Sequence, residues 1–263
     1  MRLVFPEELP ISQHRIEIEK YMRDNQVIIV CGDTGSGKTT QLPKMALEIG
    51  RANGGRRIAC TQPRRLAAVT VARRVAEEFG EEIGQTVGFK HRFDQKTSEN
   101  TRIKFMTDGI LLAETRRDPL LRSYDTIIVD EAHERSLNID FLLGILKRIL
   151  SKRKDLKVIV SSATLDANLF SKFFNDAPAL AIPGRLFPIT MRYLPPKEGE
   201  EQDLARDVVR AVDSLPYEGD ILVFLPGERD IRECAEALSG RSYADDEIIP
   251  LIATLPQAEQ QKA

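Results

Sequence analysis

The segment that most constrains the fold is residues 32–39, which read Gly-Asp-Thr-Gly-Ser-Gly-Lys-Thr and directly follow the apolar run 27–31. A glycine-rich loop of this spacing, between a strand and a helix, points backbone N–H groups and the helix N-terminus at phosphate oxygens. β-Branched residues precede the loop, and residues 40–49 have a helical pattern that ends at Gly50. The sequence therefore predicts a phosphate-binding loop with a nucleoside triphosphate as its ligand, rather than an ordinary glycine-rich turn.

Two side chains in this loop have expected roles of their own. The Lys38 ammonium would reach the β- and γ-phosphates, and the Thr39 hydroxyl would take a position on Mg²⁺. Glycine is expected because the backbone must adopt positive φ angles and lie against the ligand. The residues expected to hold the nucleotide are Gly32, Asp33, Thr34, Gly35, Ser36, Gly37, Lys38, Thr39 and Thr40.

Short β-branched runs recur along the chain, with helical stretches between them. This alternation predicts right-handed βαβ units and an α/β fold around a mostly parallel sheet. Ligands of such sheets lie at the carboxyl ends of the strands, so the segments that follow the runs are expected at one edge. The expected strands cover residues 27–31, 58–61, 103–106, 126–129, 158–161 and 221–225, and the clearest helices cover residues 66–79, 139–150 and 229–239.

The chain has 263 residues, which is more than one average domain, and its composition changes after Pro188. Residues 193–201 are rich in proline and acidic residues, a composition typical of an exposed connection. We therefore expect a first domain at residues 1–190. Residues 191–263 carry too few expected strands for a complete sheet and would form the beginning of a second domain.

The overall composition, with 42% hydrophobic and 30% charged residues, is ordinary for a globular protein. No apolar run approaches the roughly 18 residues that a membrane span needs, and residues 1–10 resemble neither a secretory signal nor a transit peptide. Three widely spaced cysteines are too few for a disulfide framework or a zinc knuckle. These features predict a cytoplasmic protein that does not associate with membranes.

The charge is unevenly distributed. The net charge of −2 argues against a protein that coats nucleic acid nonspecifically. Residues 51–122 nevertheless contain 15 Lys or Arg against 9 Asp or Glu, whereas residues 191–263 contain 8 against 16. A polyanion would therefore be met by the middle of the chain, although ordinary solvated faces remain the alternative interpretation.

Two carboxylates follow the apolar run 126–129. Asp130 and Glu131 leave the end of this expected strand, where adjacent residues point to opposite faces. One carboxylate can hold Mg²⁺ while the other activates the water that attacks the γ-phosphorus, as hydrolysis of an anhydride requires. We predict Thr39, Asp130 and Glu131 around the metal, with Glu131 as the base. Without a phosphate loop elsewhere, an acidic strand-end turn would be the better interpretation.

His133 lies two residues beyond Glu131. A lone histidine is most often a surface residue. Its position beside a predicted catalytic carboxylate favours a hydrogen bond that links the nucleotide site to a neighbouring segment such as residues 162–164.

Together, these motifs resemble those of the DEAH-box helicases of superfamily 2. The motifs are Gly-Asp-Thr-Gly-Ser-Gly-Lys-Thr-Thr at 32–40, Thr-Gln-Pro-Arg-Arg at 61–65, Thr-Asp-Gly at 107–109, Asp-Glu-Ala-His at 130–133, Ser-Ala-Thr at 162–164 and Phe-Leu-Pro-Gly at 224–227. Residues 130–144 and 227–231 most resemble the bacterial HrpA-type RNA helicases. The resemblance implies a RecA-like domain of the P-loop NTPase class, with helices on both faces of a parallel sheet, followed by the start of a second RecA-like domain.

The resemblance also implies roles for individual residues. ATP would be the nucleotide, and other nucleoside triphosphates would be accepted, because the arginine that matches Arg74 stacks on the base without reading its identity. His133, Ser162 and Thr164 would couple nucleotide state to movement of the strand, and would complete a catalytic set with Lys38 and Glu131. The backbone of single-stranded RNA would be met by Arg64, Arg65, Thr107, Asp108 and Gly109, and residues 90–93 resemble a segment that turns near the RNA.

The implied activity is that of an ATP-dependent RNA helicase that moves 3′ to 5′. The family closes its ATP site with arginines in a Gln-Arg-x-Gly-Arg-x-Gly-Arg pattern, and this chain does not contain that pattern. Because an arginine finger can be worth about three to five orders of magnitude in turnover, we expect an N-terminal portion of a longer helicase that hydrolyses ATP poorly alone. A DNA helicase and a non-catalytic nucleotide-dependent switch remain alternatives. A monomer is expected, with the ribosome or RNA–protein complexes as candidate partners.

Overall fold

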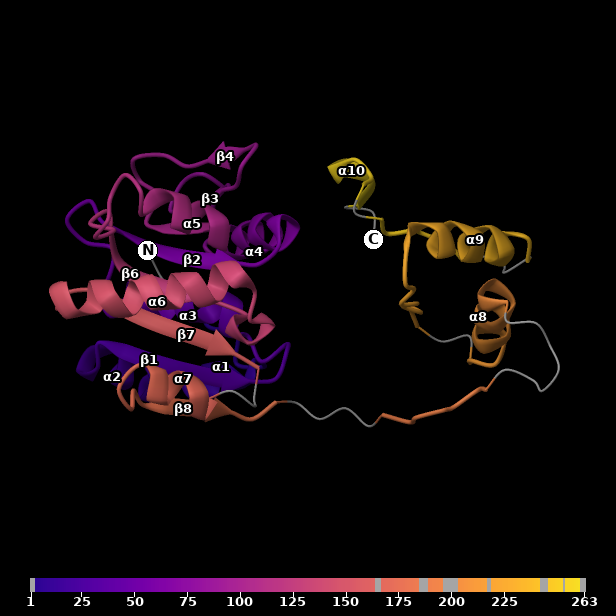
Figure 1. Cartoon of the computed structure of the whole chain (residues 1–263), viewed down its shortest axis with the longest axis horizontal. Coiled ribbons are helices and arrows are strands. Elements are labelled where there is room, and N and C mark those ends of the chain that lie inside the picture. The colour runs from indigo at the N-terminus through magenta and orange to yellow at the C-terminus, as the bar shows by residue number, and fades with distance from the viewer. Residues whose placement is uncertain are drawn as a thin grey trace. The chain divides into compact units, whose positions relative to one another are not determined.

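A computed structural model describes residues 3–163, 167–184, 189–195, 203–216, 219–241, 246–252 and 254–260. The chain divides into two compact units, Met1–Phe187 and Pro188–Ala263. Figure 1 labels the helices and strands of both units. None of the helices in the described ranges is both long and apolar enough to span a membrane.

The first unit is built on an eight-stranded sheet in the order β4-β3-β5-β2-β6-β7-β1-β8. All neighbouring strands are parallel except β3 and β4, which pair antiparallel. The strands are β1 (Val27–Gly32), β2 (Arg57–Gln62), β3 (Val87–Lys90), β4 (Gln95–Lys96), β5 (Ile103–Thr107), β6 (Tyr124–Val129), β7 (Lys157–Ser162) and β8 (Ala179–Ile182). The predicted α/β fold with a mostly parallel sheet is thus confirmed.

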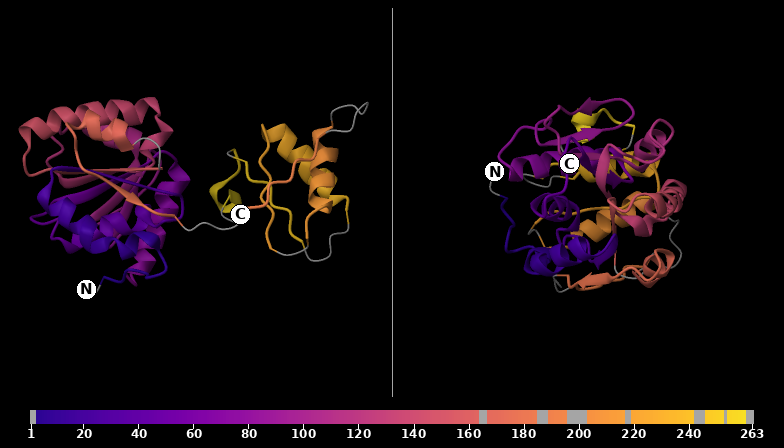
Figure 2. Two further views of the ribbon diagram at one scale, coloured as in Figure 1. Left: turned by 90° about the horizontal axis from the view of Figure 1, so that it is seen from below. Right: turned by 90° about the vertical axis from the view of Figure 1, so that its left-hand side faces the viewer.

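Helices cover both faces of this sheet, as the edge-on view in Figure 2 shows. The helices of the first unit are α1 (Pro10–Gln13), α2 (Arg15–Asp24), α3 (Lys38–Glu48), α4 (Arg65–Glu78), α5 (Asp108–Glu114), α6 (Leu137–Lys152) and α7 (Ala167–Phe173), with a 3-10 turn η1 (Ala132–Glu134). Helices α1 to α4 pack into one hydrophobic cluster, and α5, α6 and α7 pack into the other.

The two clusters follow from the two-residue period of a strand. In β1, Ile28 and Val30 belong to the cluster with α3 and α4, whereas Val27, Ile29 and Cys31 belong to the cluster with α6. Successive side chains of a strand point to opposite faces, so a strand covered on both sides must be apolar throughout. All six residues of β1 are buried. The continuous apolar run before the phosphate loop is therefore required because helices cover both faces of β1.

Because the central strands are parallel, their carboxyl ends share one edge of the sheet. The register places Cys31 of β1 beside Ser162 of β7, and Val129 of β6 beside Val160 of β7. On the other side of β6, Val129 lies beside Thr61 of β2. The residues after β1, β2, β6 and β7 therefore lie together, as ligand-binding segments of such sheets do.

The second unit contains α8 (Leu204–Asp213), α9 (Glu228–Ser239) and α10 (Gln257–Gln260). The expected strand at residues 221–225 is wrong, since these described residues form no strand and include Leu222 at 75% and Phe224 at 87% exposure. An apolar β-branched run becomes a strand only where another strand pairs with it. The described part of this unit contains no strand to supply that pairing.

Candidate nucleotide-binding site

The phosphate loop joins β1 to α3 and has the backbone that the sequence predicts. Gly35 and Gly37 adopt φ angles of +82° and +93°, which side chains rarely tolerate. A Cβ on Gly37 would lie 2.9 Å from Cγ2 of Ile11. The Ile11 N–H also donates to the Ser36 carbonyl at 3.1 Å. The N-terminal segment thus packs against the outside of the loop and leaves room for glycine alone.

Lys38 begins α3 and turns its ammonium towards the loop. Its Nζ donates to the carbonyls of Gly32 at 2.6 Å and Asp33 at 2.9 Å, and to Ser36 Oγ at 3.2 Å. Burial lowers the pKa of Lys38, while the charges of Asp130 and Glu131 act in the opposite direction. The ammonium is thus held between the loop and the acidic end of β6.

Asp130 directly follows β6 and has three hydrogen-bond donors. Its Oδ2 accepts from Thr39 Oγ1 at 2.6 Å and from Gln62 Nε2 at 2.6 Å, and its Oδ1 accepts from the Glu131 N–H at 3.0 Å. The side chain is almost completely buried. The structure therefore brings together two residues of the predicted metal set, Thr39 and Asp130, although 91 residues separate them.

The donor atoms at this point fit Mg²⁺. A hydroxyl and a carboxylate are hard oxygen ligands, and Mg²⁺ bound to a nucleotide uses few protein ligands because phosphates and waters complete its shell. Over the described ranges, no group of three or more His, Cys, Asp or Glu forms a cage for a metal ion. Thr39 and Asp130 would hold the ion, which would neutralise phosphate charge.

Glu131 has an unusual backbone and a raised pKa. Its φ of +52° is left-handed, a conformation uncommon for residues other than glycine. Burial raises the pKa of the Glu131 carboxyl, and the Asp130 charge raises it further, while the neighbouring His133 and Lys38 lower it. A carboxylate with a raised pKa is a better proton acceptor, as the predicted base requires.

His133 lies in η1 between two segments of the site. Its Nε2 is 3.3 Å from Glu131 Oε2, and its Nδ1 accepts from the Ala163 N–H at 3.1 Å. Ser162 Oγ donates to the Ala163 carbonyl at 2.9 Å. The histidine therefore connects the acidic end of β6 to the segment after β7, in the geometry that the sequence suggested. Thr164 lies outside the described residues.

Arg74 lies on α4 with its guanidinium beside the end of the same helix. Its Nε is 3.3 Å from Glu78 Oε1, and its Nη1 is 3.9 Å from Glu77 Oε2. Glu78 Oε2 in turn accepts from Gln41 Nε2 of α3 at 3.0 Å. Through Glu78, the predicted base-contacting arginine is therefore linked to the helix that begins at Lys38.

The residues expected at RNA fall into two groups. Arg64 is exposed and pairs with Glu134 at 3.4 Å, and the Arg65 guanidinium lies 4.9 Å from the ring centre of Phe93. Both side chains thus lie on the surface near the ends of the strands. Thr107 and Gly109 flank Asp108, whose side chain is only 3% exposed. Burial raises the pKa of Asp108. Contact with a strand of RNA here would come from the backbone or from the half-buried Thr107 side chain rather than from Asp108.

Comparison with known proteins agrees with this geometry. The model of the DEAD/DEAH box helicase family matches residues 12–171, which include every motif described above at the sheet edge. The chain belongs to the DEAD/DEAH box helicase family. The resemblance inferred from the motifs is thereby confirmed.

Three curated relatives of this DEAD/DEAH box chain share much of its sequence. It is 54% identical over 263 residues to an ATP-dependent RNA helicase HrpA homolog of Haemophilus influenzae, and 53% identical over 266 residues to the ATP-dependent RNA helicase HrpA of Escherichia coli. Identity to the HrpA helicase of Borreliella burgdorferi is 44% over 259 residues. The alignments cover 97 to 99% of this chain but only 20 to 31% of the relatives.

Sequence reasoning missed two residues that contact predicted site residues of this DEAD/DEAH box chain. Gln62 holds the Asp130 carboxylate, and Glu78 holds Arg74. Gln62 lies in the Thr-Gln-Pro-Arg-Arg motif, so its importance was signalled but its partner was not. Glu78 is one of two adjacent glutamates in a helix with many charges, and nothing in the sequence separates it from Glu77.

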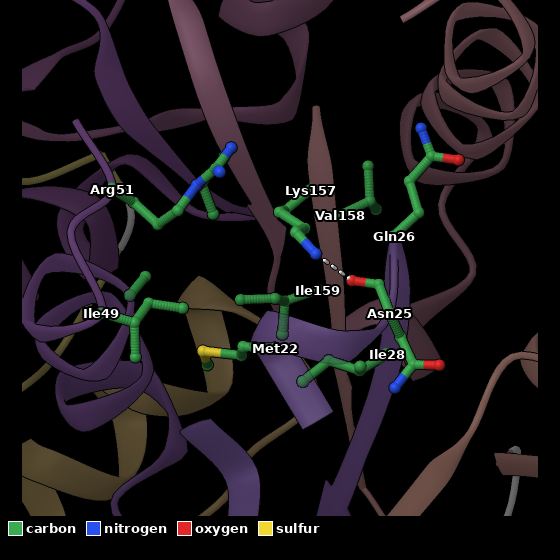
Figure 3. A pocket seen from close by; sticks show the side chains of 11 residues that line it. Met22, Asn25, Gln26, Ile28, Ile49, Arg51, Lys157, Val158 and Ile159 are labelled. Carbon is green, nitrogen blue, oxygen red and sulfur yellow. Dashed lines mark hydrogen bonds between the residues drawn. The ribbon is translucent and has the colours of Figure 1, made fainter. Parts of the chain in front are cut away.

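One small cavity lies at the other edge of the sheet (Figure 3). Its volume is about 10 Å³, enough for a single water molecule. Beside it, Lys157 Nζ donates to the Asn25 carbonyl at 2.6 Å. The cavity is lined by residues at the amino ends of β1 and β7, so the cavity has no part in the nucleotide site at the carboxyl ends.

Proposed function

We propose that this chain is the nucleotide-binding part of an ATP-dependent RNA helicase, in which hydrolysis of a nucleoside triphosphate drives 3′ to 5′ movement along single-stranded RNA. The observation that carries the proposal is the hydrogen-bonded assembly of Thr39, Asp130 and Gln62 next to the Glu131–His133–Ala163 connection. This assembly combines two metal ligands, a base, and hydrogen-bonded contacts that reach the segment after β7. The names of three relatives support ATP and RNA as the ligands.

In this proposal each side chain has a limited task. The phosphate loop and Lys38 bind the triphosphate, Thr39 and Asp130 hold Mg²⁺, and Glu131 accepts a proton from the attacking water. His133, which contacts both Glu131 and Ala163, couples changes at Glu131 to the position of residues 162–164. Arg74 stacks on the base without reading its identity, so ATP and other nucleoside triphosphates are accepted.

Arg64, Arg65 and the 107–109 segment contact the RNA backbone at the carboxyl edge of the sheet. Contacts to phosphate position a strand but do not read its sequence. Residues 51–122 carry an excess of six positive charges. Some of these side chains form hydrogen bonds within the protein: Arg57 donates to the Thr101 carbonyl and Arg102 to the Arg51 carbonyl. Fewer positive side chains are therefore available to contact RNA than the charge count suggests.

We further propose that residues 191–263 begin a second RecA-like domain, whose remainder supplies the arginines that close the site. The chain spans 20% of the length of its two HrpA relatives from Haemophilus influenzae and Escherichia coli. Alone, it should bind nucleotide and hydrolyse it slowly. In the cell we expect a monomeric cytoplasmic enzyme that acts on RNA or RNA–protein complexes.

The RNA assignment is tested by ATP hydrolysis in the full-length protein with RNA and DNA oligonucleotides of matched sequence. RNA should stimulate turnover more than DNA, because only RNA offers a 2′-hydroxyl to the protein. Equal or greater stimulation by DNA would support the DNA helicase instead. Absence of hydrolysis, with retained ATP-dependent RNA binding, would favour a nucleotide-dependent switch.

A further inference from the structure

Glu78, the last residue of α4, gathers donors from two helices. Its Oε2 accepts from Lys44 Nζ at 2.6 Å and from Gln41 Nε2 at 3.0 Å, both on α3. Its Oε1 faces Arg74 Nε at 3.3 Å. The side chain is 11% exposed, whereas that of Arg74 is 62% exposed. A largely buried carboxylate thus holds one side of an arginine that otherwise faces solvent.

The position of Glu78 is itself fixed by the buried side chain of Lys44. The Lys44 side chain is 1% exposed, donates to the Val4 carbonyl and lies with its Nζ 4.9 Å from the ring centre of Phe5. Burial alone would raise the pKa of Glu78, but the hydrogen bonds from Lys44 and Gln41 outweigh it and lower that pKa. Glu78 therefore stays ionised near neutral pH, and its hydrogen bonds with Lys44 and Gln41 hold the carboxylate in place beside Arg74.

The same carboxylate is connected to the phosphate loop. Thr40 Oγ1 donates to the Gly37 carbonyl at 3.3 Å, and Gln41 Nε2 donates both to Thr40 Oγ1 at 2.8 Å and to Glu78. These hydrogen bonds, together with the Glu78–Arg74 ion pair, connect the loop that holds phosphates to the guanidinium expected at the base. The distance between the two ends of the nucleotide site is thus set by side chains of α3 and α4.

We propose that Glu78 is a positioning residue that presents Arg74 to the base of the bound nucleotide and holds it in register with the phosphate loop. This inference rests on the proposed role of Arg74. An arginine that must stack on a planar base loses side-chain freedom on binding, and a fixed carboxylate removes part of that loss beforehand. Glu78 would thereby increase affinity for any nucleoside triphosphate without selecting among bases.

The test compares ATP with inorganic tripolyphosphate, which has the phosphates but no base. Titration calorimetry in Mg²⁺ measures both affinities for the full chain and for Glu78→Gln. Glutamine retains the shape of the side chain, but only its amide oxygen can accept a hydrogen bond. Lys44 and Arg74, which contact different oxygens of Glu78, therefore cannot both keep an acceptor. ATP affinity should fall about threefold, the size of an exposed cation–π contact, while tripolyphosphate affinity stays unchanged. Glu77→Gln, which removes the more distant neighbour of Arg74, should change neither.

Two further variants separate the possible outcomes. If Arg74→Ala leaves the ratio of the two affinities unchanged, the role of Arg74 is wrong and the inference falls with it. If Arg74→Ala alters that ratio but Glu78→Gln does not, or weakens both ligands equally, the inference about Glu78 alone is overturned. If Glu78→Gln does not fold, the double variant Lys44→Met/Glu78→Gln removes both buried charges and is expected to show the same selective loss for ATP.

Discussion

Glu131 combines a left-handed backbone with a carboxyl that resists ionisation. The backbone conformation costs about 1 to 2 kcal/mol for a residue with a side chain, and burial beside Asp130 raises the pKa. A folded-state pKa above the unfolded value stabilises the protein at low pH, and that stabilisation is lost as the pH rises through the folded pKa. At neutral pH, ionised Glu131 therefore destabilises the fold, as expected of a residue retained for chemistry.

The raised pKa of Glu131 predicts a pH profile. A base acts only when ionised, so ATP hydrolysis by the full-length protein should fall as the pH drops through a pKa above the ordinary 4.5. His133→Gln removes the imidazole, whose presence beside Glu131 lowers this pKa. The acidic limb of kcat against pH should therefore shift to higher pH in the variant. An unchanged limb would show that His133 does not influence the base.

Residue identities in the site were predictable from the sequence where a motif carries them, and partners were not. Lys38, Asp130 and Glu131 follow from spacing and from the strand that precedes each group. Gln62 and Glu78 take their importance from contacts across 68 residues and between two helices. Such contacts depend on strand order and helix packing, which local sequence patterns do not specify.

At the level of elements, the phosphate loop depends on glycine for two separate reasons. Gly37→Ala would place a side chain at φ +93° and 2.9 Å from Ile11, so it should lower the free energy of unfolding by more than about 1 kcal/mol and abolish ATP binding. Gly144→Ala in α6 is the matched control, because its Cβ would enter open space. It should stabilise the protein by up to about 1 kcal/mol. Urea unfolding and ATP titration measure stability and ATP binding for the two variants. Equal effects of Gly37→Ala and Gly144→Ala would contradict the strain assigned to Gly37.

Helix α6 offers a similar comparison between its buried and exposed faces. Leu146 is fully buried in the cluster beneath the sheet, and Phe141 is 65% exposed. Leu146→Ala should lower the free energy of unfolding by about 2 to 5 kcal/mol through the cavity it leaves. Phe141→Ala should change it by no more than about 0.5 kcal/mol. A large loss in the Phe141 variant would indicate that this face packs against another part of the protein.

The elements show where sequence patterns suffice. Five expected strands are confirmed, because each is a short, mostly apolar run whose residues are buried in the sheet. Strands β3, β4 and β8 were not predicted: β4 has two exposed residues, and β8 is an edge strand with alternate burial. The expected strand at residues 221–225 failed for the opposite reason, since an apolar run needs neighbouring strands as well as composition.

At the scale of the whole molecule, the two units differ in how much they bury. The first has two large clusters around an eight-stranded sheet, whereas the described part of the second buries only Val209, Cys234 and Ile252 among its hydrophobic residues. Apolar burial is the main stabilising contribution to folding. The units should therefore differ strongly in stability.

Hydrogen exchange tests this difference directly. Amides of β1, β2, β5, β6 and β7 should exchange slowest, because they open only with the whole first unit. Amides of α8 and α9 should exchange much faster. Equal protection of both units would show that the second unit is completed by contacts beyond those that the structure describes.

In the proposed mechanism, one site binds a nucleoside triphosphate and Glu131 activates the attacking water. The most direct measurement is single-turnover ATP hydrolysis by the full-length protein with RNA, alongside equilibrium binding of ATP in Mg²⁺, for the wild type and Glu131→Gln. The variant should bind ATP as tightly as the wild type and hydrolyse it about 100-fold more slowly or worse. Hydrolysis at the wild-type rate would contradict the assignment of Glu131 as the base.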